Sequence, residues 1–237
     1  MSKAAVIENP NKAKNVRFLG PVDISSIKDD IINLSQEYWD NYDSIKPNKF
    51  GEFKKTTEHI VFRFVSDFHQ AFPDILEYPV WEEWKNKLEP VIRSVVAQYG
   101  YKEDCIGKVM LAKLKAGAEI GKHKDSALEN VYPHKIHIPI VTNTETKFFV
   151  GDQAYHFEVG QAYEIDNIDI HGTINGGDTD RIHLLFTYYD RPMKEIKIAD
   201  PKANAVELEK AILKSGIYYY DRKLNETIDE ENAAIAK

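Results

Sequence analysis

Three residues of metal-binding type stand in two short segments of the chain. His123 and Asp125 are two positions apart in Gly-Lys-His-Lys-Asp, and His171 lies in Asp-Ile-His-Gly, 48 residues after His123. Alternate residues of a strand point to the same face, so His123 and Asp125 can meet one metal ion from one side. With His171 on a neighbouring strand they would form a two-histidine, one-carboxylate set, which leaves open positions on iron(II) for oxygen chemistry. The alternative is a chance pair, since the chain has 8 histidines and 38 acidic residues.

An arginine follows His171 by ten residues, at the start of the strand-like run Arg-Ile-His-Leu-Leu-Phe. A guanidinium inside a β-roll needs an anionic partner, and its planar fork binds a carboxylate through two parallel hydrogen bonds. Arg181 is therefore a candidate for binding the distal carboxylate of a 2-oxoacid whose other end chelates the metal. The alternative is an exposed strand residue that pairs with Asp178 or Asp180.

The segments that carry these residues are short and rich in β-branched and aromatic residues. Turn signals such as Asn-Gly-Gly-Asp at 175–178 separate them. Six such runs within about eighty residues predict an antiparallel sandwich or barrel of jelly-roll type. The runs are 109–114, 135–141, 147–150, 154–157, 162–165 and 181–188.

Helices and less regular segments are predicted outside these runs. Apolar residues recur at helical spacing over 24–42 and 81–99, and Pro90 is expected to break the second helix in two. We expect a flexible arm at 1–15, a single domain at 16–195 with the roll at about 105–190, and a helical extension at 196–237.

Composition narrows the classes of partner. The 237 residues carry a net charge of -7, which disfavours nucleic acid and anionic membranes as partners. The single cysteine, Cys105, excludes an intrachain disulfide and a cysteine-based zinc or iron–sulfur site. No long apolar run or signal peptide is evident, so we expect a cytoplasmic protein. The oligomeric state does not follow from the sequence.

Several sequence blocks between residues 114 and 175 resemble, in their order along the chain, those of one known family. That family is the aspartyl/asparaginyl β-hydroxylases, which are iron(II)- and 2-oxoglutarate-dependent dioxygenases. Together with Arg181 the blocks cover most of a catalytic roll between about Val109 and Asp190. They are Leu-Lys-Ala-Gly-Ala-Glu-Ile-Gly-Lys-His-Lys-Asp (114–125), Lys-Ile-His-Ile-Pro-Ile (135–140), Phe-Phe-Val-Gly-Asp (148–152), Gly-Gln-Ala-Tyr-Glu-Ile-Asp-Asn (160–167) and His-Gly-Thr-Ile-Asn (171–175).

The resemblance implies a mainly β protein with flanking helices and a double-stranded β-helix (jelly-roll, cupin-like) core. It implies Fe(II), 2-oxoglutarate and O₂ as cofactors, with His123, Asp125 and His171 as iron ligands. Arg181 would bind the distal carboxylate of 2-oxoglutarate, and His137 would lie near this cosubstrate.

The resemblance also implies hydroxylation of an amino acid, free or within a peptide or protein. Asp125 is present, whereas the animal protein hydroxylases of the family lack this carboxylate. The chain therefore looks closer to the bacterial and phage-type branch, which is similar to the proline cis-hydroxylases. Lys135 stands where the family usually has arginine, so a substrate contact at this position is not simply carried over.

Two basic residues would suit a substrate carboxylate. Lys135 lies two positions before His137, and Arg63 would share one face of a strand with His59, four positions earlier. Two other functions are compatible with the residues: a non-catalytic cupin-like module that binds a ligand or structural metal, and a zinc hydrolase. Neither gives Arg181 an evident task.

Overall fold

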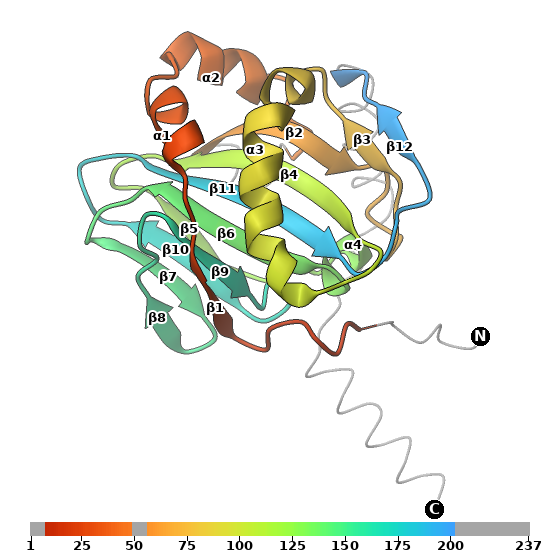
Figure 1. Ribbon diagram of the computed structural model, residues 1–237. Helices are drawn as coiled ribbons and strands as arrows, with labels where there is room; N and C mark the ends of the chain where they lie inside the picture. Colours follow the sequence, from red (N-terminus) through yellow and green to blue (C-terminus); the bar gives the residue numbers. More distant parts are fainter. Residues whose placement is uncertain (1–7, 49–55, 202–237) are drawn as a thin grey trace, which may run out of the picture.

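Two β-sheets form the body of the protein. The computed structural model describes residues 8–48 and 56–201. The larger sheet has the order β1-β9-β6-β11-β4-β2-β3-β12, the smaller one β5-β10-β7-β8, and all neighbours pair antiparallel except β12 and β3 (Figure 1). The larger sheet consists of β1 (Val16–Pro21), β2 (Thr57–Val65), β3 (Ile75–Glu77), β4 (Cys105–Leu114), β6 (His134–Val141), β9 (Gln161–Ile165), β11 (Arg181–Tyr189) and β12 (Ile196–Ile198). The smaller one consists of β5 (Glu119–His123), β7 (Thr146–Val150), β8 (Gln153–Tyr155) and β10 (His171–Asn175).

The predicted mainly β, jelly-roll fold with flanking helices is confirmed. The central strands β4 and β11 are buried over almost their whole length, as expected for strands that are covered on both faces. One face of the larger sheet packs against helices, and the other lines a cavity shared with the smaller sheet. The helices are α1 (Ser25–Ile32), α2 (Gln36–Asp43), α3 (Val80–Val96) and the short α4 (Leu128–Val131).

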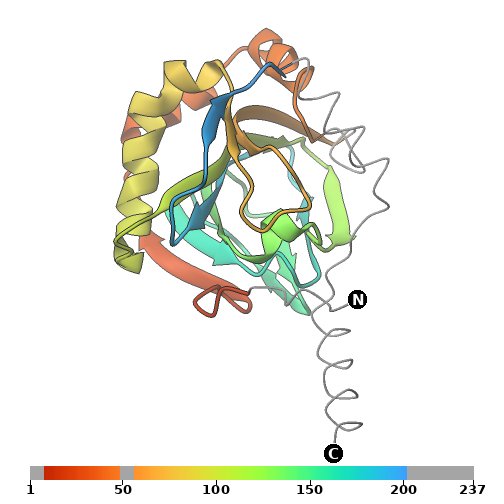
Figure 2. The same ribbon diagram turned by 90° about the vertical axis from the view of Figure 1, so that its right-hand side faces the viewer.

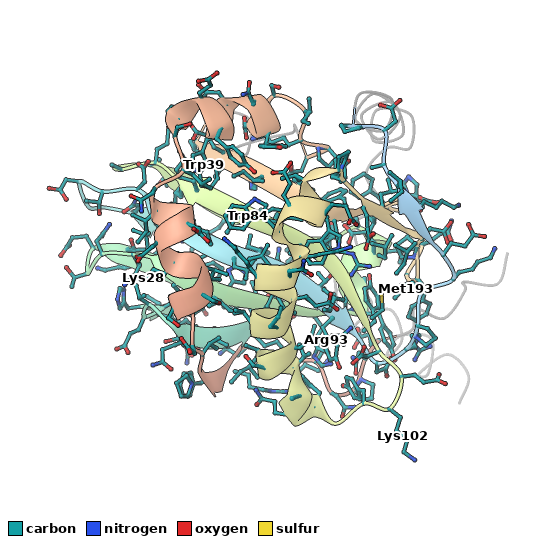
Figure 3. The ribbon with its side chains drawn as sticks, turned by 45° about the horizontal axis from the view of Figure 1, so that its top comes forward. Lys28, Trp39, Trp84, Arg93, Lys102 and Met193 are labelled. Carbon is teal, nitrogen blue, oxygen red and sulfur yellow. The ribbon has the colours of Figure 1, made fainter. Side chains whose placement is uncertain are left out.

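Helix α3 covers the outer face of the larger sheet. Its buried residues recur every three or four positions, so they form one apolar stripe. Figures 1 and 2 show α3 running across this sheet. In Figure 3, Trp84 of α3 and Trp39 of α2 lie on the side of the strands, whereas Lys102 points away. The ring of Phe62 in β2 lies 6.2 Å from Trp81 and 5.9 Å from Trp84. The stripe consists of Val80, Trp81, Trp84, Leu88, Val91, Ile92, Val95 and Val96.

Pro90 does not break this helix, contrary to the sequence-based expectation. Proline removes the hydrogen bond to the carbonyl four residues earlier, which belongs to Asn86. Both Pro90 and Asn86 are exposed, so water can hydrogen-bond to that carbonyl. The apolar stripe on the opposite side holds α3 against the sheet. Conversely, the helix expected over 24–42 is divided, because the Ser35 side chain accepts a hydrogen bond from the Tyr38 amide and starts α2 as a new helix.

The described part of the expected N-terminal arm, residues 8–15, packs against the roll. Lys12 is buried, and its ammonium donates to the carbonyl oxygens of Asn130 at 2.6 Å and Val131 at 3.2 Å. The Ala13 amide donates to Glu164 at 2.9 Å. The expectation of a flexible arm is therefore wrong for these residues, because their polar groups find partners inside the protein.

The larger sheet continues past the expected boundary at residue 195. Strand β12 (Ile196–Ile198) pairs with β3 and so belongs to the sheet. The helix expected within the 196–237 extension lies outside the described residues. Among the described residues, no helix has the length and apolar character needed to cross a membrane.

Candidate metal and cosubstrate site

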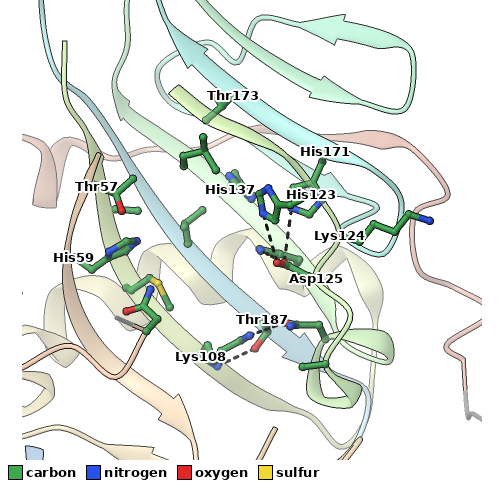
Figure 4. Close-up of a pocket in the computed structure, with 18 of the residues that line it drawn as sticks. Thr57, His59, Lys108, His123, Lys124, Asp125, His137, His171, Thr173 and Thr187 are labelled. Carbon is green, nitrogen blue, oxygen red and sulfur yellow. Dashed lines mark hydrogen bonds and ion pairs between the residues drawn. The ribbon is translucent and has the colours of Figure 1, made fainter. Parts of the chain in front are cut away.

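The three candidate metal ligands meet where β5 and β10 pair. His123 ends β5 and His171 begins β10, and the two residues are direct partners across the ladder. Asp125 follows β5, and its amide donates to the Asn167 carbonyl at 2.9 Å, which places its side chain beside both histidines. One ligand atom from each of the three residues lies within 4.8 Å of the others (Figure 4). The structure thus brings together the set that the sequence pattern predicted.

Backbone hydrogen bonds orient both imidazole rings. The Nδ1 atom of His123 lies 2.8 Å from the Gly121 carbonyl oxygen, and that of His171 lies 3.0 Å from the Asp169 carbonyl oxygen. A carbonyl only accepts, so each Nδ1 carries the proton and donates. In a neutral ring with this orientation the lone pair is on Nε2, and both Nε2 atoms lie 3.8 Å from Asp125 carboxylate oxygens. This is the arrangement in which neutral histidines bind a metal.

Asp125 remains ionised although it is enclosed. Burial would raise the pKa of its carboxyl, but the Lys135 ammonium and the two imidazoles outweigh this effect and hold the pKa well below its usual range. Lys135 forms an ion pair with Oδ2, and the Asn167 amide donates to the same oxygen at 3.2 Å. Burial also lowers the pKa of His171 to about 4. The site therefore offers a carboxylate and unprotonated imidazole at neutral pH.

These ligands line a cavity of about 750 Å³ between the two sheets. Arg181, His137, Lys135 and His59 line it as well. This volume exceeds what a single small dicarboxylate needs and lies within the range of ligand-binding cavities. It can hold 2-oxoglutarate and a second small molecule together.

Arg181 enters this cavity without a carboxylate partner among the described residues. It is 3% exposed, its Nη2 donates to Nδ1 of His183 at 2.7 Å, and its Nε has no hydrogen-bond partner there. Burial lowers the pKa of Arg181 to about 9, so the guanidinium is still charged at neutral pH. Asp180 instead accepts a hydrogen bond from the Ala116 amide, so it does not serve as the expected alternative partner. A buried guanidinium in this state fits an anionic ligand.

His137 lies beside Arg181 in the same cavity. Its Nδ1 is 3.4 Å from Nδ1 of His183, and its Nε2 has no hydrogen-bond partner among the described residues. Burial, reinforced by the nearby Lys135 and Arg181 charges, lowers the pKa of His137 well below its ordinary value. His137 is therefore neutral and can form a hydrogen bond with a bound ligand.

Arg63 lies outside the cavity, in contrast to the sequence-based expectation. Its Nε is 3.3 Å from Glu77, and its guanidinium lies over the Trp81 ring. The register between β2 and β4 shifts between Val61 and Arg63, so Arg63 faces away from the side that His59 occupies. The rule that residues four apart share a face fails across such a bulge.

The cavity wall also contains a buried ion pair that the sequence patterns did not predict. Lys108 of β4 donates to Glu129 of α4 at 2.7 Å and to the Asn130 side chain at 2.6 Å. All three residues line the cavity, and burial raises the pKa of the Glu129 carboxyl even though Lys108 opposes this effect. Alternation along β4 was the available signal, because Lys108 shares its face with Met110 and Ala112 of a buried strand.

Comparison with known proteins identifies the family. Residues 23–191, which make up more than two thirds of the chain, match the profile described as aspartyl/asparaginyl β-hydroxylase. The chain belongs to the aspartyl/asparaginyl β-hydroxylase family. The cofactors of this β-hydroxylase family member are Fe(II), 2-oxoglutarate and O₂, and its general activity is that of a 2-oxoglutarate-dependent hydroxylase. No curated protein matches the chain.

Several solved structures are similar to this β-hydroxylase family member at low sequence identity. AviO1 from Streptomyces viridochromogenes Tue57 is 13% identical with a TM-score of 0.51, over 76% of this chain and 91% of that chain. A 2OG-Fe(II) oxygenase-family oxidoreductase from Burkholderia pseudomallei is 14% identical with a TM-score of 0.46, over 71% and 85%. The viral collagen prolyl hydroxylase of Paramecium bursaria Chlorella virus-1, in its 2OG complex, is 12% identical with a TM-score of 0.43, over 74% and 96%.

Proposed function

We propose that this protein hydroxylates an amino acid, free or within a peptide or protein, with His123, Asp125 and His171 as its iron ligands. One observation carries the proposal. These three residues line the same cavity as Arg181, which is buried and has no carboxylate partner among the described residues. A cupin-like binding module needs neither open metal positions nor a buried arginine. A zinc hydrolase would leave Arg181 without a task.

The residues have distinct tasks in this reaction. Iron(II) with 2-oxoglutarate and O₂ supplies the oxidising power for inserting oxygen into a C–H bond, and succinate and CO₂ are released. Arg181 binds the distal carboxylate of 2-oxoglutarate, and His183, which accepts from its Nη2, orients the guanidinium. His137 is placed to form a hydrogen bond with the same cosubstrate through Nε2.

Lys135 is proposed to contact the substrate. Its ammonium lies at the Asp125 carboxylate, so it is next to the place where the reacting C–H bond must come. This flexible cation has three donors, so it can donate a hydrogen bond to an oxygen acceptor of the substrate beside the metal. Apolar side chains such as Phe148 and Leu185 also line the cavity and keep water from the reacting groups.

The test is to add iron(II) to the anaerobic protein and titrate 2-oxoglutarate. We expect the weak visible charge-transfer band of the chelate, followed by succinate once air is admitted. His123→Ala should abolish both signals, and Arg181→Ala should chiefly weaken 2-oxoglutarate binding. His156→Ala is the control, because His156 is exposed and does not line the cavity. A folded, iron-loaded protein that gives neither band nor succinate would favour the binding module.

A further inference from the structure

The Lys108–Glu129 pair and Arg181 lie toward opposite ends of the cavity floor. That floor is formed by β4 and β11, in which Arg181 pairs with Leu114, whereas the Lys108 amide donates to the Thr187 hydroxyl at 2.8 Å. Arg181 and Thr187 are six residues apart on one strand, which corresponds to about 20 Å at ~3.3 Å per residue. The five-carbon chain of 2-oxoglutarate cannot span this distance. The cosubstrate at Arg181 therefore leaves the Lys108 end for a different molecule.

This end of the cavity offers a cation and an anion side by side. The Lys108 ammonium has three donors, of which two are used by Glu129 and Asn130. Its remaining donor has no hydrogen-bond partner among the described residues, and the centroid of the Phe64 ring lies 5.7 Å from the ammonium. Glu129 accepts the hydrogen bond from Lys108 through Oε2. Its other carboxylate oxygen, Oε1, has no hydrogen bond to a described residue. One donor and one carboxylate oxygen are thus left for a ligand of mixed charge.

Stability alone does not explain this pair. Enclosing two charges costs several kcal/mol of desolvation per ion, and apolar residues of similar size are often as stabilising or more so. The pair also sits in the wall of an otherwise largely apolar cavity, with Phe64 and Phe68 nearby. A ligand with its own carboxylate and ammonium would gain a second ion pair with each member.

We propose that Lys108 binds the α-carboxylate and Glu129 the α-ammonium of a free amino acid. A residue within a peptide has neither charge at its α-carbon. The substrate class of this site is therefore the free α-amino acid and not a peptidyl residue. The inference rests on the proposed function for its chemistry, but the binding of the amino acid can be measured separately.

The first experiment uses the wild-type protein and chemical variation of the ligand. The twenty standard L-amino acids are titrated by calorimetry into the protein with iron(II) and 2-oxoglutarate under argon. The best binder is then compared with its Nα-acetyl and its α-carboxamide derivatives. We expect each derivative to bind at least about 100-fold more weakly, because it leaves one buried charge without its partner.

The second experiment uses variants of β4 and α4. The double variant Lys108→Met, Glu129→Leu replaces the ion pair by apolar side chains, so it leaves no single buried charge behind and is expected to fold. Its preference for the free amino acid over the acetylated form should fall to within about 3-fold. Lys113→Met is the control, because Lys113 is a buried lysine of the same strand paired with Glu58 outside the cavity. This control should keep the wild-type preference.

The outcomes separate this inference from the proposed function. Equal binding of free, acetylated and amidated forms would overturn the α-group assignment, as would failure of all twenty amino acids to bind. So would a full wild-type preference in the double variant. If the protein discriminates between these ligands but forms no succinate with iron and air, the assignment stands and the hydroxylase function fails.

Discussion

Arg181 carries a buried charge that no described carboxylate neutralises. Replacing it by methionine should therefore raise the free energy of unfolding of the ligand-free protein by about 1 kcal/mol or more. The same change should weaken 2-oxoglutarate binding at least about 100-fold, because the bidentate carboxylate contact is lost. Urea unfolding and calorimetric titration of 2-oxoglutarate measure the two effects.

A second buried arginine provides the control for this prediction. Arg63 has Glu77 as partner, so Arg63→Met should lower the free energy of unfolding, by about 1–3 kcal/mol, and leave 2-oxoglutarate binding intact. If both variants lose the same stability, the Arg181 charge is not a cost to the ligand-free fold.

The buried histidines predict how stability depends on pH. Burial lowers the pKa of His59, His137 and His183 well below 6.5, so the folded state excludes protons that the unfolded chain binds. Their full contribution to stability is present above pH 6.5 and is lost as the pH falls below it. Each histidine accounts for about 1.4 kcal/mol per pH unit. Urea unfolding with a chelator, which also keeps His171 with its pKa of about 4 free of metal, should show a loss of about 4–6 kcal/mol between pH 7.5 and 5.5. A constant stability over this range would contradict the buried, neutral state.

The pairing of β5 with β10 predicts the effect of a single methyl group. A Cβ at Gly172 would meet the Ile120 carbonyl oxygen at 2.9 Å and the Lys122 amide nitrogen at 3.2 Å, and both are backbone atoms. Gly172→Ala should therefore push the strands apart beside His171 and weaken Mn(II) binding at least about 10-fold by calorimetry. In Gly121→Ala the methyl group meets open space, so this control should bind as the wild type does. Equal affinities would mean that the strand spacing does not position the ligands.

Sequence patterns predicted those elements whose side chains follow a simple period. The strands of the roll follow from alternation, and the meeting of His123, Asp125 and His171 at one point follows from their spacing. The placement of Arg63 was wrong because a bulge shifts the alternation. The pair of Lys108 and Glu129 was missed because its members belong to different elements, and only tertiary contact makes them partners. Pro90 was misjudged because packing on the opposite face of α3 outweighs the local loss of one hydrogen bond.

The candidate metal site is part of a fold that does not depend on a metal. Its histidine rings are oriented by backbone carbonyls and by a continuous strand ladder, and the core around it is extensive. Removing the metal with EDTA should therefore leave the far-UV circular dichroism spectrum unchanged, unlike that of a protein that folds around zinc. The melting temperature should fall only by the amount that the ligand's binding free energy accounts for. A loss of strand signal on chelation would contradict a preformed site.

A ligand set that is already in place also decides how the protein competes for ions. Because no folding step favours one ion over another, affinity should follow the general order for divalent metals, in which nickel and copper exceed iron(II). The ion that occupies the site should therefore depend on this affinity order and on the free concentration of each ion in the surroundings. In a cell that buffers copper, nickel and zinc tightly, the resident ion is set by metal homeostasis, and in a nickel-affinity purification it is set by the column.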